Sequence, residues 1–219
     1  MKIKTRCIRN NGSEIHLLMY GEFNPSNYLS KLTSIEIEKL KTFGSITRKR
    51  EFVAVRILRD SLFGLEPILY NSLGAPYINK KGFVSISHSK NMVGFAFNSE
   101  HPIGLDLEYP QEKIHKIQSK FISDTERQLF DTNDRKVLTQ LWSAKEAMYK
   151  LAGRKKIIFN SELLLAPSSE NKLRGTIINL DHQLKVNLDI FEFEKTIITI
   201  NSKPVERIES NSQSNSQSN

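Results

Sequence analysis

The segment IGLDLE, residues 103–108, decides the fold of this chain. Apolar and polar residues alternate along it, which is typical of a β-strand with one buried face. In such a strand Gly104, Asp106 and Glu108 point to one side, and the three apolar residues point to the other. The two carboxylates then lie about 7 Å apart, which suits a hard cation such as Mg²⁺ with water and phosphate as further ligands. An edge strand with ordinary surface acids is the simpler interpretation of these six residues alone.

Composition and charge narrow the class of protein. A chain of 219 residues forms one large domain or two small ones. Its formal charge of +8 indicates anionic partners: nucleic acid, a phosphorylated small molecule or an acidic protein. Because Cys7 is the only cysteine, an internal disulfide and a cysteine-based zinc site are excluded, and Cys7 is expected to be a passive small hydrophobe.

The chain carries no sequence signal for a membrane. No apolar run approaches the roughly 18 residues that a membrane-spanning helix needs. The first residues, MKIKTR, lack the apolar centre of a signal peptide. We therefore expect a cytoplasmic protein that does not bind membranes.

Capping signals and periodicity divide the chain into two similar stretches. Each stretch predicts a short helix that opens with a capping box, a longer helix that ends at a glycine, and then strands. In the first stretch these are helices near 34–43 and 46–63, and strands at 14–20, 83–89 and 92–97, with 103–108 as the third strand of that meander. In the second stretch they are helices near 124–130 and 134–152, and strands near 172–180, 184–193 and 195–201.

This repeat predicts an α+β protein of two similar halves related by a pseudo-twofold axis. The expected division is an N-terminal half at 1–101, a C-terminal half at 102–208, and a disordered Ser/Gln/Asn tail at 209–219. A ligand would bind in the cleft between the halves.

The second long helix places unusual residues on one face. Trp142, Glu146, Tyr149 and Lys150 share that face by helical spacing, so two large aromatic side chains flank a pair of charges. An ordinary surface ion pair between Glu146 and Lys150 is the simpler interpretation of the charges. In the first long helix, the basic run at 48–50 opposes the helix dipole, which favours an anion nearby.

Taken together, these motifs resemble the Sfp-type 4′-phosphopantetheinyl transferases of the holo-acyl-carrier-protein synthase superfamily. The resemblance covers roughly residues 45–155. It rests on Gly74-x-Pro76, the serine-rich strand 85–89, Gly104-x-Asp106-x-Glu108, Phe121 with Glu126, and Trp142-Ser143-x-Lys145-Glu146-x-x-x-Lys150. The third and the last of these motifs, about 40 residues apart, are together specific.

The resemblance implies transfer of the phosphopantetheine arm of coenzyme A to a serine of a carrier protein, with release of adenosine 3′,5′-bisphosphate. Asp106, Glu108 and Glu146 would hold Mg²⁺. Lys150 would pair with a phosphate or stabilise the leaving group. Glu146 or Glu126, directly or through a metal-bound water, would act as the base, with Glu146 preferred.

Further residues would bind coenzyme A by the same resemblance. Ser87, His88, Arg48 and Arg50 would contact its 3′-phosphate end. Lys145 and Lys150 would also contact coenzyme A.

One position departs from the family pattern. Ala75 stands where the family commonly has a lysine that contacts phosphate. The candidates to compensate are Lys80, Lys81 or the basic helix; otherwise coenzyme A binds more weakly.

The expected partner is an acidic carrier protein, which matches the positive charge of this chain. Its pathway stays open among fatty-acid, polyketide and peptide synthesis. We expect a monomer, since two fused halves complete one cleft. Two alternatives remain: a basic nucleic-acid-binding module, although no nucleic-acid motif is present, and a family member that binds coenzyme A or a carrier with little turnover.

Overall fold

The computed structural model describes residues 3–209. The first part of the chain forms β1 (Ile3–Asn10), β2 (Ser13–Tyr20), the 3-10 helix η1 (Pro25–Lys31), α1 (Ser34–Lys41), α2 (Ile46–Phe63), β3 (Leu69–Tyr70), β4 (Pro76–Tyr77), β5 (Phe83–Ser89) and β6 (Met92–Asn98). The second part forms β7 (Leu105–Glu108), α3 (Lys113–Ile117), the 3-10 helix η2 (Gln118–Lys120), α4 (Asp124–Leu129), α5 (Arg135–Leu151), α6 (Phe159–Glu162), β8 (Leu163–Pro167), β9 (Lys172–Ile178), β10 (His182–Phe193), β11 (Thr196–Asn201) and β12 (Glu206–Glu209).

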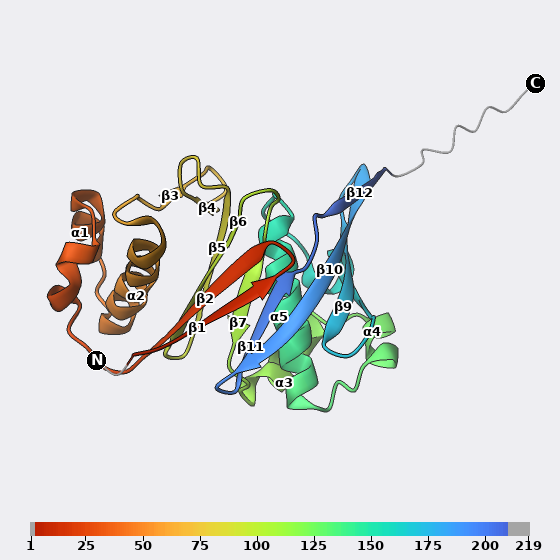
Figure 1. The fold of residues 1–219 in the computed structure, drawn as a ribbon. Coiled ribbons are helices and arrows are strands. Elements are labelled where there is room, and N and C mark those ends of the chain that lie inside the picture. Colours follow the sequence, from red (N-terminus) through yellow and green to blue (C-terminus); the bar gives the residue numbers. More distant parts are fainter. Residues whose placement is uncertain (1–2, 210–219) are drawn as a thin grey trace, which may run out of the picture.

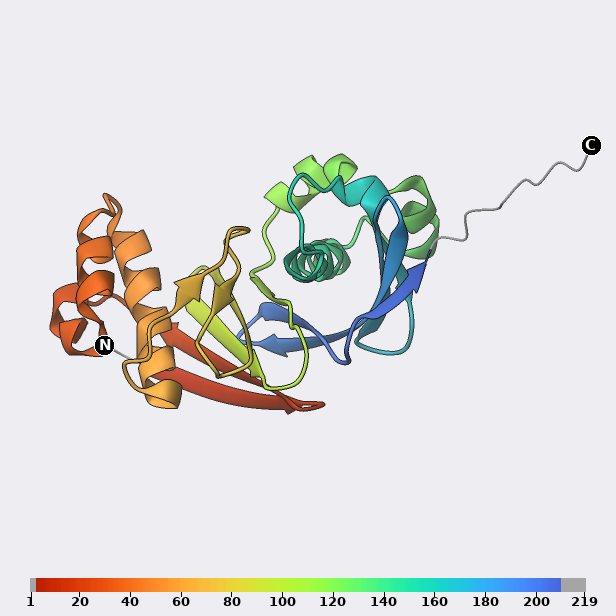
Figure 2. The same ribbon diagram turned by 90° about the horizontal axis from the view of Figure 1, so that it is seen from above.

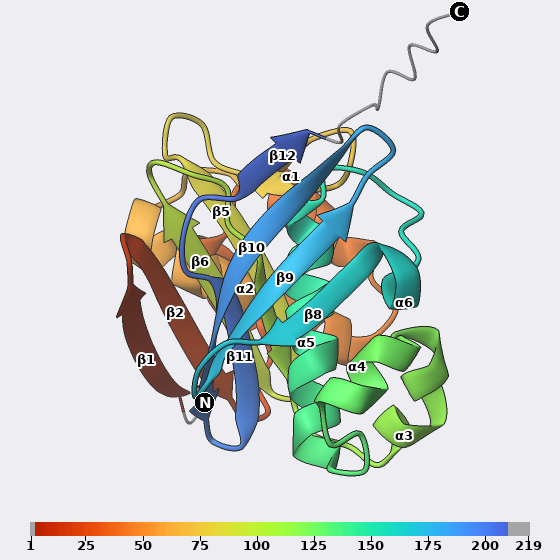
Figure 3. The ribbon, with the colours of Figure 1, turned by 90° about the vertical axis from the view of Figure 1, so that its right-hand side faces the viewer.

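The strands form two antiparallel sheets, which confirms the predicted α+β class. The first sheet has the order β1-β2-β6-β5-β4-β3, and the second has the order β7-β11-β10-β9-β8 with β12 beside β10. Figure 1 shows α1 and α2 on the outer side of the first sheet, and Figure 3 shows the strands of the second sheet from their open side. Each sheet therefore has its own long helix.

The two long helices begin and end at the residues that their sequence signals predict. Ser45 caps α2 by accepting a hydrogen bond from the N–H of Arg48, and Asp134 caps α5 in the same way. Gly64 and Gly153 follow these helices with φ of +62° and +67°. Because residues with a β-carbon rarely adopt such values, a glycine is the residue expected after each helix.

A glutamate in the first turn of each short helix pairs with a cation from the long helix of the same half. Glu36 forms a capping box with Thr33 and accepts a hydrogen bond from Arg59 at 2.7 Å. Glu126 stands at the equivalent position of α4 and accepts one from Lys145 at 2.8 Å. All four charged side chains are buried. The two halves thus share a buried ion pair between the short and the long helix, in addition to the same order of elements.

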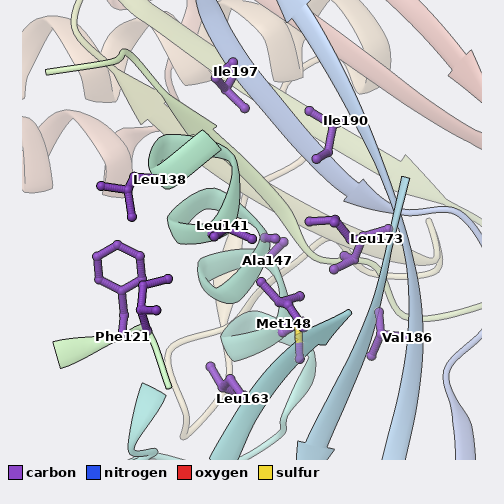
Figure 4. Packing of buried hydrophobic residues seen from close by; sticks show 14 of the residues in the cluster. Phe121, Leu138, Leu141, Ala147, Met148, Leu163, Leu173, Val186, Ile190 and Ile197 are labelled. Carbon is purple, nitrogen blue, oxygen red and sulfur yellow. The ribbon is translucent and has the colours of Figure 1, made fainter. Parts of the chain in front are cut away.

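Three apolar clusters hold these layers together. The largest surrounds α5, and Figure 2 looks almost along that helix and shows it inside the curve of the second sheet. In Figure 4 the side chains of Leu141 and Met148 on α5 point toward Leu173 and Val186 of the sheet. A second cluster lies between α2 and the first sheet, and a third joins the two sheets through β2, β6, β7 and β11.

The place of β7 differs from the prediction. We expected it to be the third strand of a meander with β5 and β6, but it pairs antiparallel with β11 of the second sheet, with Asp106 opposite Thr199. Its other edge faces β5, where side-chain hydroxyls take the place of a backbone ladder. The alternation of this segment predicts a strand, but alternation does not choose the neighbouring strand.

Two further expectations concern the ends and the surroundings of the chain. The predicted tail lies outside the described residues except for Glu209, the last residue of β12. Within residues 3–209, no helix combines the length and the apolar character that a membrane span requires.

β6 ends at Asn98 and β7 begins at Leu105, so the expected division at 101/102 falls in the connection between the sheets.

Candidate active site

One face of α5 lies along β7 and brings four charged side chains together. Trp142 donates its indole N–H to Glu108 Oε1 at 2.8 Å, and Lys150 Nζ donates to Asp106 Oδ1 at 3.2 Å. Glu146 lies between them on the helix, close enough to interact with the charges of both carboxylates. Residues four apart on the helix and residues two apart on the strand thus bring their side chains together in a single cluster. We call Asp106, Glu108 and Glu146 the carboxylate cluster.

Gly104 permits this close approach. A β-carbon at this position would lie 2.1 Å from the carbonyl oxygen of Ala147 on α5. No side chain fits at that separation, so a glycine is required where the helix crosses the start of β7. This steric reason explains why Gly104 precedes the two acids in the strand.

Serine hydroxyls of β5 hold the free edge of β7. Ser85, Ser87 and Ser89 accept hydrogen bonds from the N–H groups of Leu105, Leu107 and Tyr109 at 2.9, 3.1 and 2.8 Å. Ser87 also donates its hydroxyl to Asp106 Oδ1 at 3.0 Å. The middle serine therefore positions both the backbone of β7 and the carboxylate at the centre of the cluster.

Replacing Ser87 with alanine is expected to lower the free energy of unfolding by about 1–3 kcal/mol, because the buried N–H of Leu107 loses its acceptor. Ser85→Ala removes the same kind of bond without touching Asp106, so it serves as the matched control. Chemical denaturation should show similar losses for the two variants. Mg²⁺ titration should show weaker binding for Ser87→Ala alone; equal Mg²⁺ affinities would contradict the positioning of Asp106 by Ser87.

The carboxylate cluster holds more negative charge than its neighbours neutralise. Burial, followed by repulsion from Asp106, raises the pKa of Glu108 to about 7. The same two causes raise the pKa of Glu146 to about 7, although Lys150 opposes the shift. Three carboxylates face one ammonium group, so a divalent cation would complete the balance of charge.

Asp106 has the free acceptor that such a cation needs. Its Oδ2 is buried and has no hydrogen-bond partner among residues 3–209. A buried oxygen without a partner is costly in a folded protein unless a ligand satisfies it. The oxygens of the three carboxylates do not all lie within 4.8 Å of one another, so side chains would have to move before all three could bind one ion. The donor set, with three carboxylates and a free buried oxygen, fits the chemistry of Mg²⁺.

In cation-free buffer, the free energy of unfolding is expected to fall as the pH rises from about 5 to about 8. Between the ordinary pKa of a glutamate and about 7, the folded chain keeps protons on Glu108 and Glu146 that the unfolded chain has lost. Stability from this source is therefore present at low pH and is lost as the carboxylates ionise. Urea denaturation across this range should show a smaller slope for Glu108→Gln; an unchanged slope would contradict the assignment.

A cleft of about 820 Å³ opens beside Lys150. It lies where the loop before β5 faces the C-terminal end of α5. Its lining includes Tyr70, Ala75, Tyr77, Arg154 and Lys155. Exposed aromatic rings and cations thus stand next to the carboxylate cluster, a combination that suits a ligand with both phosphates and a flat ring.

Glu126 and Lys145 lie away from this cleft. Lys145 Nζ donates to Glu126 and to the carbonyl oxygens of Phe121 and Phe159, so all three of its hydrogens are used. Both oxygens of Glu126 also have partners, including the N–H of Leu165. Both side chains are fully paired, as a charge without access to solvent must be. The contact of Lys145 with coenzyme A and the role of Glu126 as a candidate base stay predictions.

The other sequence-predicted residues lie on different surfaces. Ser87 is buried and donates to Asp106, and its contact with a phosphate stays a prediction. His88 points from β5 to the opposite side, where it is exposed and lies 3.6 Å from Glu51 of α2. These opposite directions follow from the alternation of a strand.

The two arginines at the start of α2 also separate. Arg48 is exposed, and its guanidinium lies 5.8 Å from the ring centre of Phe43. Arg50 donates to the carbonyl oxygen of Phe23 at 2.9 Å. Neither arginine lines the cleft beside Lys150.

Sequence reasoning missed the cations that follow α5. Arg154 and Lys155 line the cleft, and Lys155 Nζ lies 3.4 Å from the carbonyl oxygen of Ser72 on the facing loop. The run Arg154-Lys155-Lys156 directly after Gly153 was the available signal, since a basic run just beyond a helix end is suited to bind an anion.

Comparisons with known proteins identify the family of this chain. The family model described as the 4′-phosphopantetheinyl transferase superfamily matches residues 102–200, which include the whole carboxylate cluster. The 4′-phosphopantetheinyl transferase HetI of Nostoc sp. (strain PCC 7120) is 31% identical over 163 residues, which cover 64% of this chain and 69% of that protein. With its carboxylate cluster, its cleft and this degree of identity, the chain belongs to the 4′-phosphopantetheinyl transferase superfamily.

Proposed function

We propose that this protein transfers 4′-phosphopantetheine from coenzyme A to a serine of an apo carrier protein, in a reaction that depends on Mg²⁺. The observation that carries the proposal is the carboxylate cluster with Lys150 beside a cleft of about 820 Å³, in a member of this superfamily. The name of HetI and the description of the family, both 4′-phosphopantetheinyl transferase, support the transfer of phosphopantetheine.

Asp106, Glu108 and Glu146 are the residues that would hold Mg²⁺. The unpartnered Oδ2 of Asp106 supports this assignment, as do the raised pKa values of the two glutamates, which a bound cation would lower again. When bound, Mg²⁺ supplies charge neutralisation for the pyrophosphate of coenzyme A.

Glu146 is the proposed base. A serine hydroxyl needs a proton acceptor to become a good nucleophile. Once a bound cation lowers the pKa of Glu146 from about 7, its carboxylate is ionised near neutral pH and can accept a proton. The serine oxygen of the carrier would attack the β-phosphorus of coenzyme A while its proton passes to Glu146.

Lys150 would stabilise the leaving group. Its ammonium donates to Asp106 and to the carbonyl oxygens of Leu105 and Ile86, and its partly exposed side chain lines the cleft. As the bond between the β-phosphorus and the bridging oxygen breaks, negative charge develops on the departing adenosine 3′,5′-bisphosphate. A fixed cation at that point lowers the barrier without moving.

Ala75 stands where the family commonly has a lysine that contacts phosphate, and Lys155 is proposed to replace that lysine. Both residues line the cleft, and Lys155 reaches the same loop through the carbonyl of Ser72. Lys80 and Lys81 are not among the residues that line it.

The Lys155→Ala variant is expected to raise the KM for coenzyme A by about tenfold with little change in kcat, because one charge-assisted phosphate contact is lost. Lys156→Ala is the matched control, since Lys156 is exposed and does not line the cleft. Steady-state kinetics with varied coenzyme A measures both. Equal KM values for the two variants would remove Lys155 from the coenzyme A site.

The proposed function is tested by incubating the protein with coenzyme A, Mg²⁺ and a panel of apo carrier proteins. Each modified carrier should gain the mass of one phosphopantetheine group, and a chelator of Mg²⁺ should prevent the gain. Intact-protein mass spectrometry measures the product. Binding of coenzyme A by calorimetry without a mass gain on any carrier would overturn the proposal and indicate a binding protein without turnover.

A further inference from the structure

The hairpin of β1 and β2 carries a group of metal-ligating side chains that the proposed reaction does not use. Cys7 and His16 are directly opposite each other in the register of the two strands. Glu14 is two residues before His16, so its side chain leaves the same face of β2. A thiol, an imidazole and a carboxylate therefore project from one face of one hairpin, which is drawn in red in Figure 1.

The ligand atoms of these three side chains lie close together. Among the described residues, this is the one group of three His, Cys, Asp or Glu side chains whose ligand atoms all fall within 4.8 Å of one another. His16 Nε2 lies 3.9 Å from Cys7 Sγ and 3.0 Å from Glu14 Oε2. Around a tetrahedral zinc ion, such sulfur–nitrogen and nitrogen–oxygen separations are about 3.5 Å and about 3.3 Å. Shifts of a few tenths of an ångström would bring the three atoms to that geometry.

The neighbouring charge supports the arrangement of the carboxylate. Arg9 Nε donates to Glu14 Oε1 at 3.2 Å, while the other oxygen, Oε2, faces His16. The hydrogen bond from Arg9 thus fixes one oxygen of Glu14, while the other oxygen stays directed at the imidazole of His16. A hydrogen bond of this kind orients a metal ligand and strengthens the site.

The donor set selects the kind of ion. Sulfur and nitrogen ligands favour zinc and neighbouring transition metals, whereas the all-oxygen carboxylate cluster favours Mg²⁺. Cys7 is exposed, so water can fill the fourth position. The exposure of Cys7 differs from the expectation of a passive hydrophobic residue. The single cysteine excludes a zinc site built on cysteines but does not exclude a mixed one.

We propose that Cys7, Glu14 and His16 form a second metal site that binds a transition-metal ion of the zinc class. The site is separate from the carboxylate cluster, because β1 and β2 lie at the opposite end of the first sheet from β3, whereas the cluster is carried by β7 and α5. Its ion links the edge strand β1 to β2, and it therefore stabilises a strand that has a neighbour on one side only.

The full-length protein, titrated with Co²⁺ as a spectroscopic substitute for Zn²⁺, tests the proposal. We expect one Co²⁺ per chain and a thiolate-to-cobalt charge-transfer absorption in the near ultraviolet, which added Zn²⁺ removes by competition. Because Cys7 is the only cysteine, this absorption reports on one known sulfur. Cys7→Ser should abolish it, and Glu14→Gln and His16→Ala should each weaken Co²⁺ binding by about tenfold or more.

A histidine elsewhere in the chain provides the control. His115→Ala, in α3, should leave the absorption and the Co²⁺ affinity unchanged. Absence of the charge-transfer absorption would overturn the proposal, and so would an affinity that is insensitive to His16→Ala, which would indicate binding by the exposed thiol alone. Circular dichroism should confirm that each variant is folded. The readout does not involve transfer activity, so it stands or falls independently of the proposed function.

Discussion

Asp106→Asn is expected to reduce phosphopantetheine transfer by about a thousandfold or more, since it removes an anionic ligand at the centre of the cluster. Asp106 joins more of the site than any other carboxylate: it accepts from Ser87 and from Lys150, and it raises the pKa of both Glu108 and Glu146. The neutral amide keeps the shape of the side chain. The loss should therefore appear in kcat at saturating coenzyme A, measured by the mass gain of an apo carrier.

A second buried aspartate provides the control for this experiment. Asp189 on β10 is 6% exposed, against 5% for Asp106. Its register partner is Ile200, which lies opposite Leu105, so its side chain leaves the other face of the second sheet from Asp106. Asp189→Asn should therefore keep transfer activity. If Asp106→Asn stayed active while remaining folded, the assignment of the cation to this cluster would be wrong.

Lys145→Ala is expected to lower the free energy of unfolding by about 3–5 kcal/mol, because it leaves the Glu126 carboxylate buried without its cation. Burial lowers the pKa of Lys145, and the pairing with Glu126 opposes that shift. Two backbone carbonyls that accept from its ammonium would also lose their donor. Urea denaturation should show the loss as a large fall in the midpoint.

An exposed pair between α5 and β10 shows how much burial contributes. Lys136 and Glu192 lie 2.6 Å apart with side chains 56% and 45% exposed, so Lys136→Ala should cost about 1 kcal/mol or less. The double variant Lys145→Met with Glu126→Gln should recover part of the stability lost in Lys145→Ala. If Lys145→Ala were no worse than Lys136→Ala, the buried pair would not be what holds α4 against α5. A folded Glu126→Gln variant without transfer activity would instead favour Glu126 over Glu146 as the base.

Much of the site could be predicted because its spacing is local. Two-residue spacing in a strand puts Asp106 and Glu108 on one face, and four-residue spacing in a helix puts Trp142, Glu146 and Lys150 on another. These periods are properties of the backbone and need no knowledge of the neighbours. The bounds of α2 and α5 were predictable for the same reason, since capping side chains and a terminal glycine act within one turn.

Other roles depend on contacts between distant parts of the chain. The sequence shows that Ser87 and His88 are adjacent on a strand. Which of the two side chains contacts the carboxylate cluster depends on which face of β5 is covered by β7. Likewise, the capping-box position of Glu126 was readable, but its pairing with Lys145 required α5 to pack against α4. Side-chain type predicts that a group is charged, and only its packing shows whether that charge meets solvent, a partner or a ligand.

The sequence by itself therefore determined the α+β class, the main helices and the strand and helix faces that carry the acids and Lys150, because each follows from short-range periodicity and capping. The tertiary structure decided the rest: that β7 joins the second sheet, that Lys145 is buried and pairs with Glu126, and that Lys155 rather than Lys80 or Lys81 lines the cleft. It also brought Cys7 and His16 to one face of the hairpin. These outcomes depend on which surfaces become buried together, and burial is a property of the whole fold rather than of any segment.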